Sequence, residues 1–137
     1  MPVPTPDGKL RPGDLPPLLL GIGDEHRVQP RVVSITQPTE LGTVYSQAEV
    51  RALADSAHAR GLLLHMDGAR LANAAVALDL PFRAFTTEAG VDLLSFGGTK
   101  NGLLAADAVV FLQGAGGADL AFIRKQGMQL ASKMRFL

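Results

Sequence analysis

GLLLHMDGAR at residues 61–70 and VDLLSFGGTKNG at residues 91–102 are the two stretches that decide the fold. Each begins with an apolar run that predicts a buried β-strand, over Gly61–Met66 and over Val91–Phe96. Each run then ends in glycine and polar residues, which indicate that the chain leaves the strand there. The carboxyl ends of neighbouring parallel strands border one crevice, so we expect these two polar ends to lie together.

The preceding part of the chain predicts a strand followed by a helix. Arg31–Thr36 is rich in β-branched residues, which favour a strand. Ser46 and Glu49 have the S-x-x-E spacing of a capping box, in which each side chain satisfies a free backbone donor at the start of a helix. We expect this helix to end near Gly61 and to bury one apolar face. That face consists of Val50, Leu53, Ala54 and Ala57.

The remaining elements complete an α/β pattern. A helix is predicted over Leu71–Leu80, and a final helix is predicted after Asp119, whereas two prolines leave only a poor helix in Arg11–Leu20. The apolar stripe of the final helix would contain Leu120, Ile123, Gly127, Leu130, Met134 and Leu137. Too few residues precede the strand Asp107–Leu112 for a crossover helix, so this strand is expected to be antiparallel. The prediction is a mainly parallel sheet with helices on both faces and one antiparallel strand.

Composition excludes several classes of function. The 137 residues fit one domain, and 13 basic residues balance 13 acidic ones, so charge favours neither a nucleic-acid partner nor a membrane partner. There is no cysteine, and the three histidines show no metal-ligand spacing, so we expect no metal site. The start, MPVPTPDG, lacks the features of a signal peptide, which leaves the cytoplasm as the expected location.

Asp67 and Lys100 suggest a specific cofactor. A carboxylate at the end of one strand and a lysine after the next is the arrangement that holds pyridoxal phosphate: the lysine forms a Schiff base and the carboxylate pairs with the ring nitrogen. Burial in an apolar site would free the lysine amine as a nucleophile, and Gly97 and Gly98 would let the backbone approach a ligand. The alternatives are that Asp67 caps a following helix and that Lys100 is a surface lysine.

Four further residues are candidates around this site. The planar guanidinium of Arg70 suits a carboxylate or a ring oxygen, although it could equally pair with a nearby acid. The hydroxyls of Ser95 and Thr99 could bind a phosphate or lie near the lysine, or could bond to the backbone. His65 lies on the same strand face as Asp67, and we interpret it as a satisfied, buried histidine rather than as a catalytic base.

The two central motifs resemble those of the threonine aldolases and related β-eliminating lyases. HMDGARLANA at residues 65–74 is similar to the family signature around its pyridine-nitrogen aspartate, and SFGGTKNG at residues 95–102 is similar to the segment that carries its cofactor lysine. TELGTVYS at residues 39–46 resembles the low-specificity bacterial branch. The resemblance covers essentially the whole chain. It implies that Lys100 binds pyridoxal phosphate covalently, that Asp67 contacts the ring nitrogen, and that Arg70 contacts the ring oxygen and the substrate carboxylate.

The resemblance also implies a reaction, which is the cleavage of a threonine-type β-hydroxy-α-amino acid to glycine and an aldehyde. Residues 1–137 would form the central part of the large domain of a transferase-like fold, without the N-terminal phosphate cradle and the C-terminal small domain. The full-length family is usually homo-oligomeric. The loop after Arg31–Thr36 reads QPTE and lacks a histidine that many relatives have there.

Three alternatives stay open at this point. A β-eliminating lyase would release pyruvate and ammonia instead of glycine and an aldehyde. A phosphate-receiving module would use Asp67 as the acceptor, although the sequence shows no second acid beside it to hold Mg²⁺. Finally, the chain could be an inactive fragment of such an enzyme.

Overall fold

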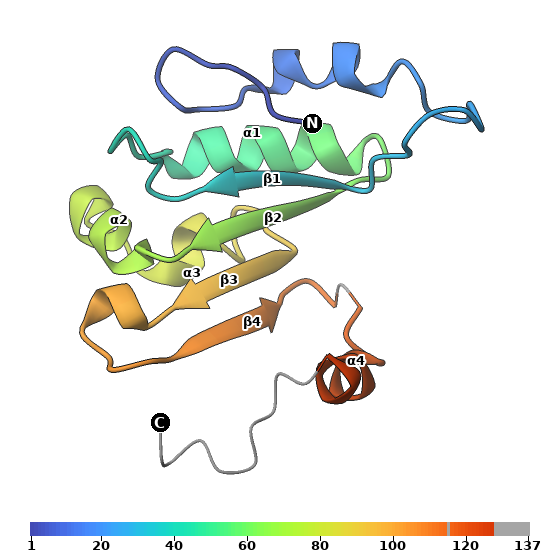
Figure 1. The fold of residues 1–137 in the computed structure, drawn as a ribbon. Coiled ribbons are helices and arrows are strands. Elements are labelled where there is room, and N and C mark those ends of the chain that lie inside the picture. Colours follow the sequence, from blue (N-terminus) through green and yellow to red (C-terminus); the bar gives the residue numbers. More distant parts are fainter. Residues whose placement is uncertain (115, 128–137) are drawn as a thin grey trace.

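The computed structural model describes residues 1–114 and 116–127, and these form a four-stranded sheet with helices (Figure 1). The strands are β1 (Val32–Thr36), β2 (Leu63–Gly68), β3 (Leu93–Gly97) and β4 (Asp107–Phe111). The α-helices are α1 (Gln47–His58), α2 (Leu71–Leu78), α3 (Phe82–Phe85) and α4 (Leu120–Gln126). The 3-10 helices are η1 (Pro12–Asp14), η2 (Pro16–Leu19) and η3 (Thr99–Asn101). No helix in the described ranges is both long enough and apolar enough to span a membrane.

The sheet has the order β1-β2-β3-β4, and the predicted strand directions are confirmed. The first two neighbouring pairs are parallel and the last pair is antiparallel. The chain passes from β3 to β4 through the short turn of η3. This turn is too short to carry the chain back to the other end of β3, so β4 runs antiparallel to it. As a result, the carboxyl ends of β1, β2 and β3 and the start of β4 lie at the same end of the sheet.

Burial on the strands alternates, so one face of the sheet carries the core. Val33, Ile35, Leu64, Met66 and Leu94 are buried on the face against which α1 packs. Positions on the opposite face are much more open, since Val32, Leu63 and Val109 are 46%, 37% and 56% exposed. The prediction of helices on both faces is therefore confirmed for only one face in the described part of the chain.

Helix α1 follows its sequence signals closely. Its four predicted core residues are fully buried. The Ser46 Oγ accepts from the backbone N–H of Glu49 (3.2 Å), and the Glu49 carboxylate accepts from the backbone N–H of Ser46 (2.7 Å). The capping box is thus present at the residues where it was predicted.

We expect Ser46→Ala to lower the free energy of unfolding by about 1 kcal/mol, because it removes the acceptor for one free N–H of the first turn. Urea unfolding followed by circular dichroism measures this change. Ser56→Ala is the matched control, because Ser56 lies inside α1, where alanine is the better helix former. Equal losses in the two variants would contradict the capping role.

Other element boundaries differ from the predictions. β2 begins at Leu63 rather than Gly61, because the N–H of Leu62 still bonds to Ala57 at the end of α1. It continues to Gly68, whose register partner is in β3. The segment Arg11–Leu20 forms two short 3-10 helices, as its prolines suggested. Of the stripe predicted for the final helix, Leu130, Met134 and Leu137 lie outside the described residues.

Candidate functional site

Asp67 and Ser95 lie side by side at the carboxyl edge of the sheet. They are register partners on β2 and β3, and Thr36 is the register partner of Asp67 on β1. The two polar strand ends therefore converge, as the sequence predicted. Parallel pairing produces this arrangement directly, because it aligns the carboxyl ends of successive strands.

A hollow of about 270 Å³ opens beside these two residues, and we call it the smaller hollow. Its lining consists of Asp67, Ala69, Ser95, Phe96, Gly97, Asp107, Ala108 and Val109. Asp67 Oδ1 accepts from the backbone N–H of Ala69 (3.0 Å), which stabilises the turn after β2. The alternative that Asp67 caps the following helix is wrong, because α2 begins at Leu71 with Arg70 as its N-cap. Because the carboxylate also borders the hollow, this turn contact is compatible with binding a ligand. Sequence reasoning missed Asp107, whose place in the hollow follows only from the β3–β4 register.

Lys100 follows β3 directly, in η3, and its side chain is exposed. The expectation of a buried lysine is therefore wrong for the described part of the chain, and Lys100 is not among the residues that line the smaller hollow. Thr99 is also exposed, and its Oγ1 accepts from the backbone N–H of Ala106 (3.2 Å). This contact is the backbone-bonding alternative considered for Thr99.

Gly97 and Gly98 pack closely against other parts of the chain. A Cβ on Gly97 would lie 2.8 Å from the Cα of Ala69, and a Cβ on Gly98 would lie 2.9 Å from the carbonyl oxygen of Ala106. Both distances are too short for a side chain, so glycine is required for chain packing at these positions. Gly97 thereby holds the loop carrying Lys100 against the start of the loop after β2. Gly97 also borders the smaller hollow, and the expectation that the two glycines let the backbone approach a ligand stays a prediction.

Arg70 lies on the side of the sheet edge near β1. Its Nη1 donates to Oε1 of Glu40 at 3.1 Å, so it pairs with a nearby acid, as the alternative reading proposed. Glu40 is largely exposed, with 74% of its side chain accessible. A pair this open to water is weak, which leaves the guanidinium available to a competing carboxylate.

His65 has hydrogen-bond partners on both ring nitrogens, as expected for a satisfied histidine, but it is half-buried rather than buried. Nδ1 lies 2.8 Å from Ser34 Oγ, and Nε2 lies 2.9 Å from Ser95 Oγ. Burial lowers the pKa of the His65 imidazole below its usual 6.5, against an opposing effect of Asp67. Sequence reasoning missed Ser34, whose partnership with His65 depends on the β1–β2 register.

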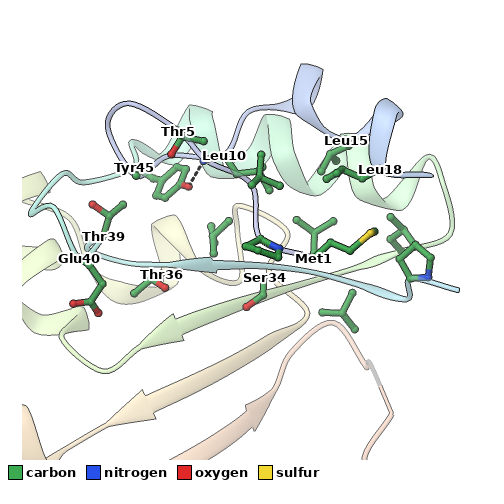
Figure 2. A pocket seen from close by; sticks show the side chains of 18 of the residues that line it. Met1, Thr5, Leu10, Leu15, Leu18, Ser34, Thr36, Thr39, Glu40 and Tyr45 are labelled. Carbon is green, nitrogen blue, oxygen red and sulfur yellow. Dashed lines mark hydrogen bonds between the residues drawn. The ribbon is translucent and has the colours of Figure 1, made fainter. Parts of the chain in front are cut away.

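A larger hollow of about 430 Å³ lies between the first 19 residues and the free edge of β1 (Figure 2). Apolar side chains from the N-terminal segment, including Leu10, Leu15 and Leu18, line it together with β1. Tyr45 closes one side, and its hydroxyl accepts from the backbone N–H of Leu10 (2.6 Å). We call it the larger hollow; Ser34 also belongs to its lining.

Comparisons with known proteins agree with the motifs. The low specificity L-threonine aldolase of Pseudomonas aeruginosa is 45% identical over 133 residues, which cover 97% of this chain and 38% of that protein. The enzyme of the same name from a Pseudomonas species is 45% identical over 130 residues, or 95% of this chain and 38% of that protein. The solved threonine aldolase of Leishmania major superposes with a TM-score of 0.82 at 36% identity, over 90% of this chain and 36% of that one.

This chain spans well under half the length of these relatives. The family model described as "Beta-eliminating lyase" nevertheless matches residues 1–136, nearly the whole chain. Sequence and structure therefore agree on the same group of proteins. The chain belongs to the beta-eliminating lyase family.

Proposed function

We propose that this chain carries the aspartate- and lysine-bearing part of a pyridoxal-phosphate-dependent lyase. The enzyme would cleave a threonine-type β-hydroxy-α-amino acid to glycine and an aldehyde. The observation that carries the proposal is the convergence of Asp67 and Ser95 at the smaller hollow, with Lys100 in the loop that follows Ser95. The similarity to low specificity L-threonine aldolases supports a threonine-type substrate.

The residues at the sheet edge fit this cofactor chemically. When bound, pyridoxal phosphate would supply an electron sink for breaking a bond at the substrate Cα. Asp67 would hold the proton on the ring nitrogen, because a carboxylate beside that nitrogen favours its cationic form. Lys100 would attach the cofactor covalently through its amine. Its exposure leaves it accessible, although it must turn towards the hollow to act.

Arg70, Ser95 and Thr99 would position the cofactor and the substrate. Arg70 can exchange its open contact with Glu40 for the substrate carboxylate, with which it can form two parallel hydrogen bonds. The hydroxyls of Ser95 and Thr99 would donate to oxygen atoms of the cofactor. Metal chemistry is not part of the proposal, and residues 1–114 and 116–127 contain no cluster of three metal-ligating side chains.

The proposal extends to the surroundings of the site. Residues 1–137 would form a partial cofactor-binding large domain, with the phosphate cradle and the small domain supplied by other parts of the enzyme. The full-length enzyme would be a homo-oligomer, as the family resemblance implies, and we expect it in the cytoplasm. A β-eliminating lyase is the second candidate because it gives the family its description. Product analysis separates the two, since one releases glycine and an aldehyde and the other releases pyruvate and ammonia.

An absorbance titration with pyridoxal phosphate tests the proposal on the chain as it stands. Borohydride reduction then fixes the bound cofactor, and peptide mapping identifies the modified lysine. We expect modification at Lys100. Lys9, whose amine is held 3.0 Å from Glu49, and the exposed Lys125 serve as internal controls. Absence of a visible band, or equal labelling of all three lysines, would mean that this chain is an inactive fragment.

A further inference from the structure

Three side chains form a hydrogen-bonded row across the more exposed face of the sheet. Ser34 lies on β1, His65 on β2 and Ser95 on β3, and the imidazole bridges the two hydroxyls at 2.8 and 2.9 Å. Ser34 borders the larger hollow and Ser95 borders the smaller hollow. The row therefore connects the two hollows through a single ring.

Counting protons limits the row to two arrangements. A neutral imidazole has one N–H donor and one bare nitrogen. One serine must therefore donate to the bare nitrogen, and the other must accept from the N–H. If Nε2 carries the proton, Ser34 donates and Ser95 accepts, which leaves the Ser95 hydroxyl proton free for the smaller hollow. If Nδ1 carries it, the free proton is that of Ser34, at the larger hollow.

The charges around the row favour the first arrangement. Asp67 is the register partner of Ser95, and Asp67 and Asp107 both border the smaller hollow. These carboxylates attract hydrogen-bond protons towards that side. Glu40 borders the larger hollow, but 74% of its side chain is exposed, so water screens its charge. Thr36, which is the register partner of Asp67 on β1, carries no charge. Burial lowers the pKa of His65, so the neutral ring persists around pH 7.

We infer that His65 is a positioning residue: its Nε2–H donates to Ser95 and thereby directs the Ser95 hydroxyl as a donor into the smaller hollow. The hollow then presents a carboxylate acceptor beside a hydroxyl donor. An occupant with a protonated ring nitrogen would meet Asp67, and one of its acceptor atoms would meet Ser95. The inference deepens the proposed function and rests on it only for the identity of the occupant.

Nitrogen-15 NMR of the cofactor-free chain reads this arrangement directly, because the protonated and bare imidazole nitrogens have distinct shifts. At a pH above the His65 titration we expect the Nε2–H tautomer in the wild type. Ser34→Ala should retain this tautomer, because Ser95 still accepts. Ser95→Ala should lower the Nε2–H fraction relative to Ser34→Ala, because it removes the acceptor of that N–H, whereas the Ser34 hydroxyl can either accept from an Nδ1–H or donate to a bare Nδ1. His26, which is exposed and forms no such row, provides the internal control.

An Nδ1–H ring in the wild type, or a larger loss of the Nε2–H tautomer in Ser34→Ala than in Ser95→Ala, would overturn the inference. The wild-type measurement decides this even if a variant fails to fold. If His65 had only a structural role, the two serine variants would change its tautomer ratio to the same extent. Because no cofactor is added, failure to bind pyridoxal phosphate would refute the proposed function and leave this result standing.

Discussion

Lys100→Ala is expected to abolish covalent attachment of pyridoxal phosphate, with complete loss of the visible absorbance band. An alanine has no amine with which to bond the cofactor aldehyde, and noncovalent contacts with Asp67 or Ser95 cannot replace that bond. The side chain of Lys100 is exposed and lies in η3 rather than in the core, so its removal should leave the fold intact. Titration with the cofactor, followed by borohydride reduction and mass measurement, quantifies the loss.

Lys125→Ala is the matched control for this experiment. It removes an exposed lysine from α4, an element without buried residues, and should leave attachment unchanged. Circular dichroism of both variants checks that they fold like the wild type. If Lys100→Ala kept the band and Lys125→Ala lost it, the cofactor lysine would have been assigned wrongly. Equal partial losses would indicate nonspecific labelling of surface amines.

Much of the fold follows from local signals in the sequence. The capping box at Ser46 and the helical spacing after it predicted α1, because both act within a few residues. The short connection before Asp107 predicted an antiparallel β4, since chain length alone limits where the next strand can lie. The convergence of Asp67 and Ser95 followed from parallel pairing. The first two features need no information about distant contacts, whereas the third also requires that β2 and β3 are neighbours in the sheet.

The features that the sequence missed depend on tertiary contacts. Helix α3 has only four residues, and its formation depends on the burial of Phe85 and on a hydrogen bond from Thr86 Oγ1 to the carbonyl of Phe82. Such a short helix is marginal without packing. The partners of His65 are set by strand register. The need for glycine at position 97 comes from the Ala69 backbone, which is distant in sequence.

Gln37 shows how the edge of the sheet is held in place, and nothing in its local sequence predicted this role. Its side chain is fully buried. Oε1 accepts from the backbone N–H of Tyr45 (2.9 Å), and Nε2 donates to the Tyr45 carbonyl (2.8 Å). Its own N–H bonds to the carbonyl of Asp67 (2.8 Å) and extends the β1–β2 ladder to the candidate site. One residue therefore ties the loop after β1 to the strand end that carries Asp67.

Gln37→Leu is expected to lower the free energy of unfolding by roughly 2–6 kcal/mol, because it leaves two buried backbone groups of Tyr45 unsatisfied at about 1–3 kcal/mol each. Gln29→Leu removes similar side-chain contacts with the backbone of Gly21 and Gly23, but in an exposed loop where water replaces them. Its cost should be about 1 kcal/mol or less. Urea unfolding of both variants makes the comparison, and equal costs would show that burial adds nothing to the Gln37 contacts. A larger cost for Gln37→Leu would mean that the loop between β1 and α1 is stabilised by a buried amide that lies outside both sequence motifs.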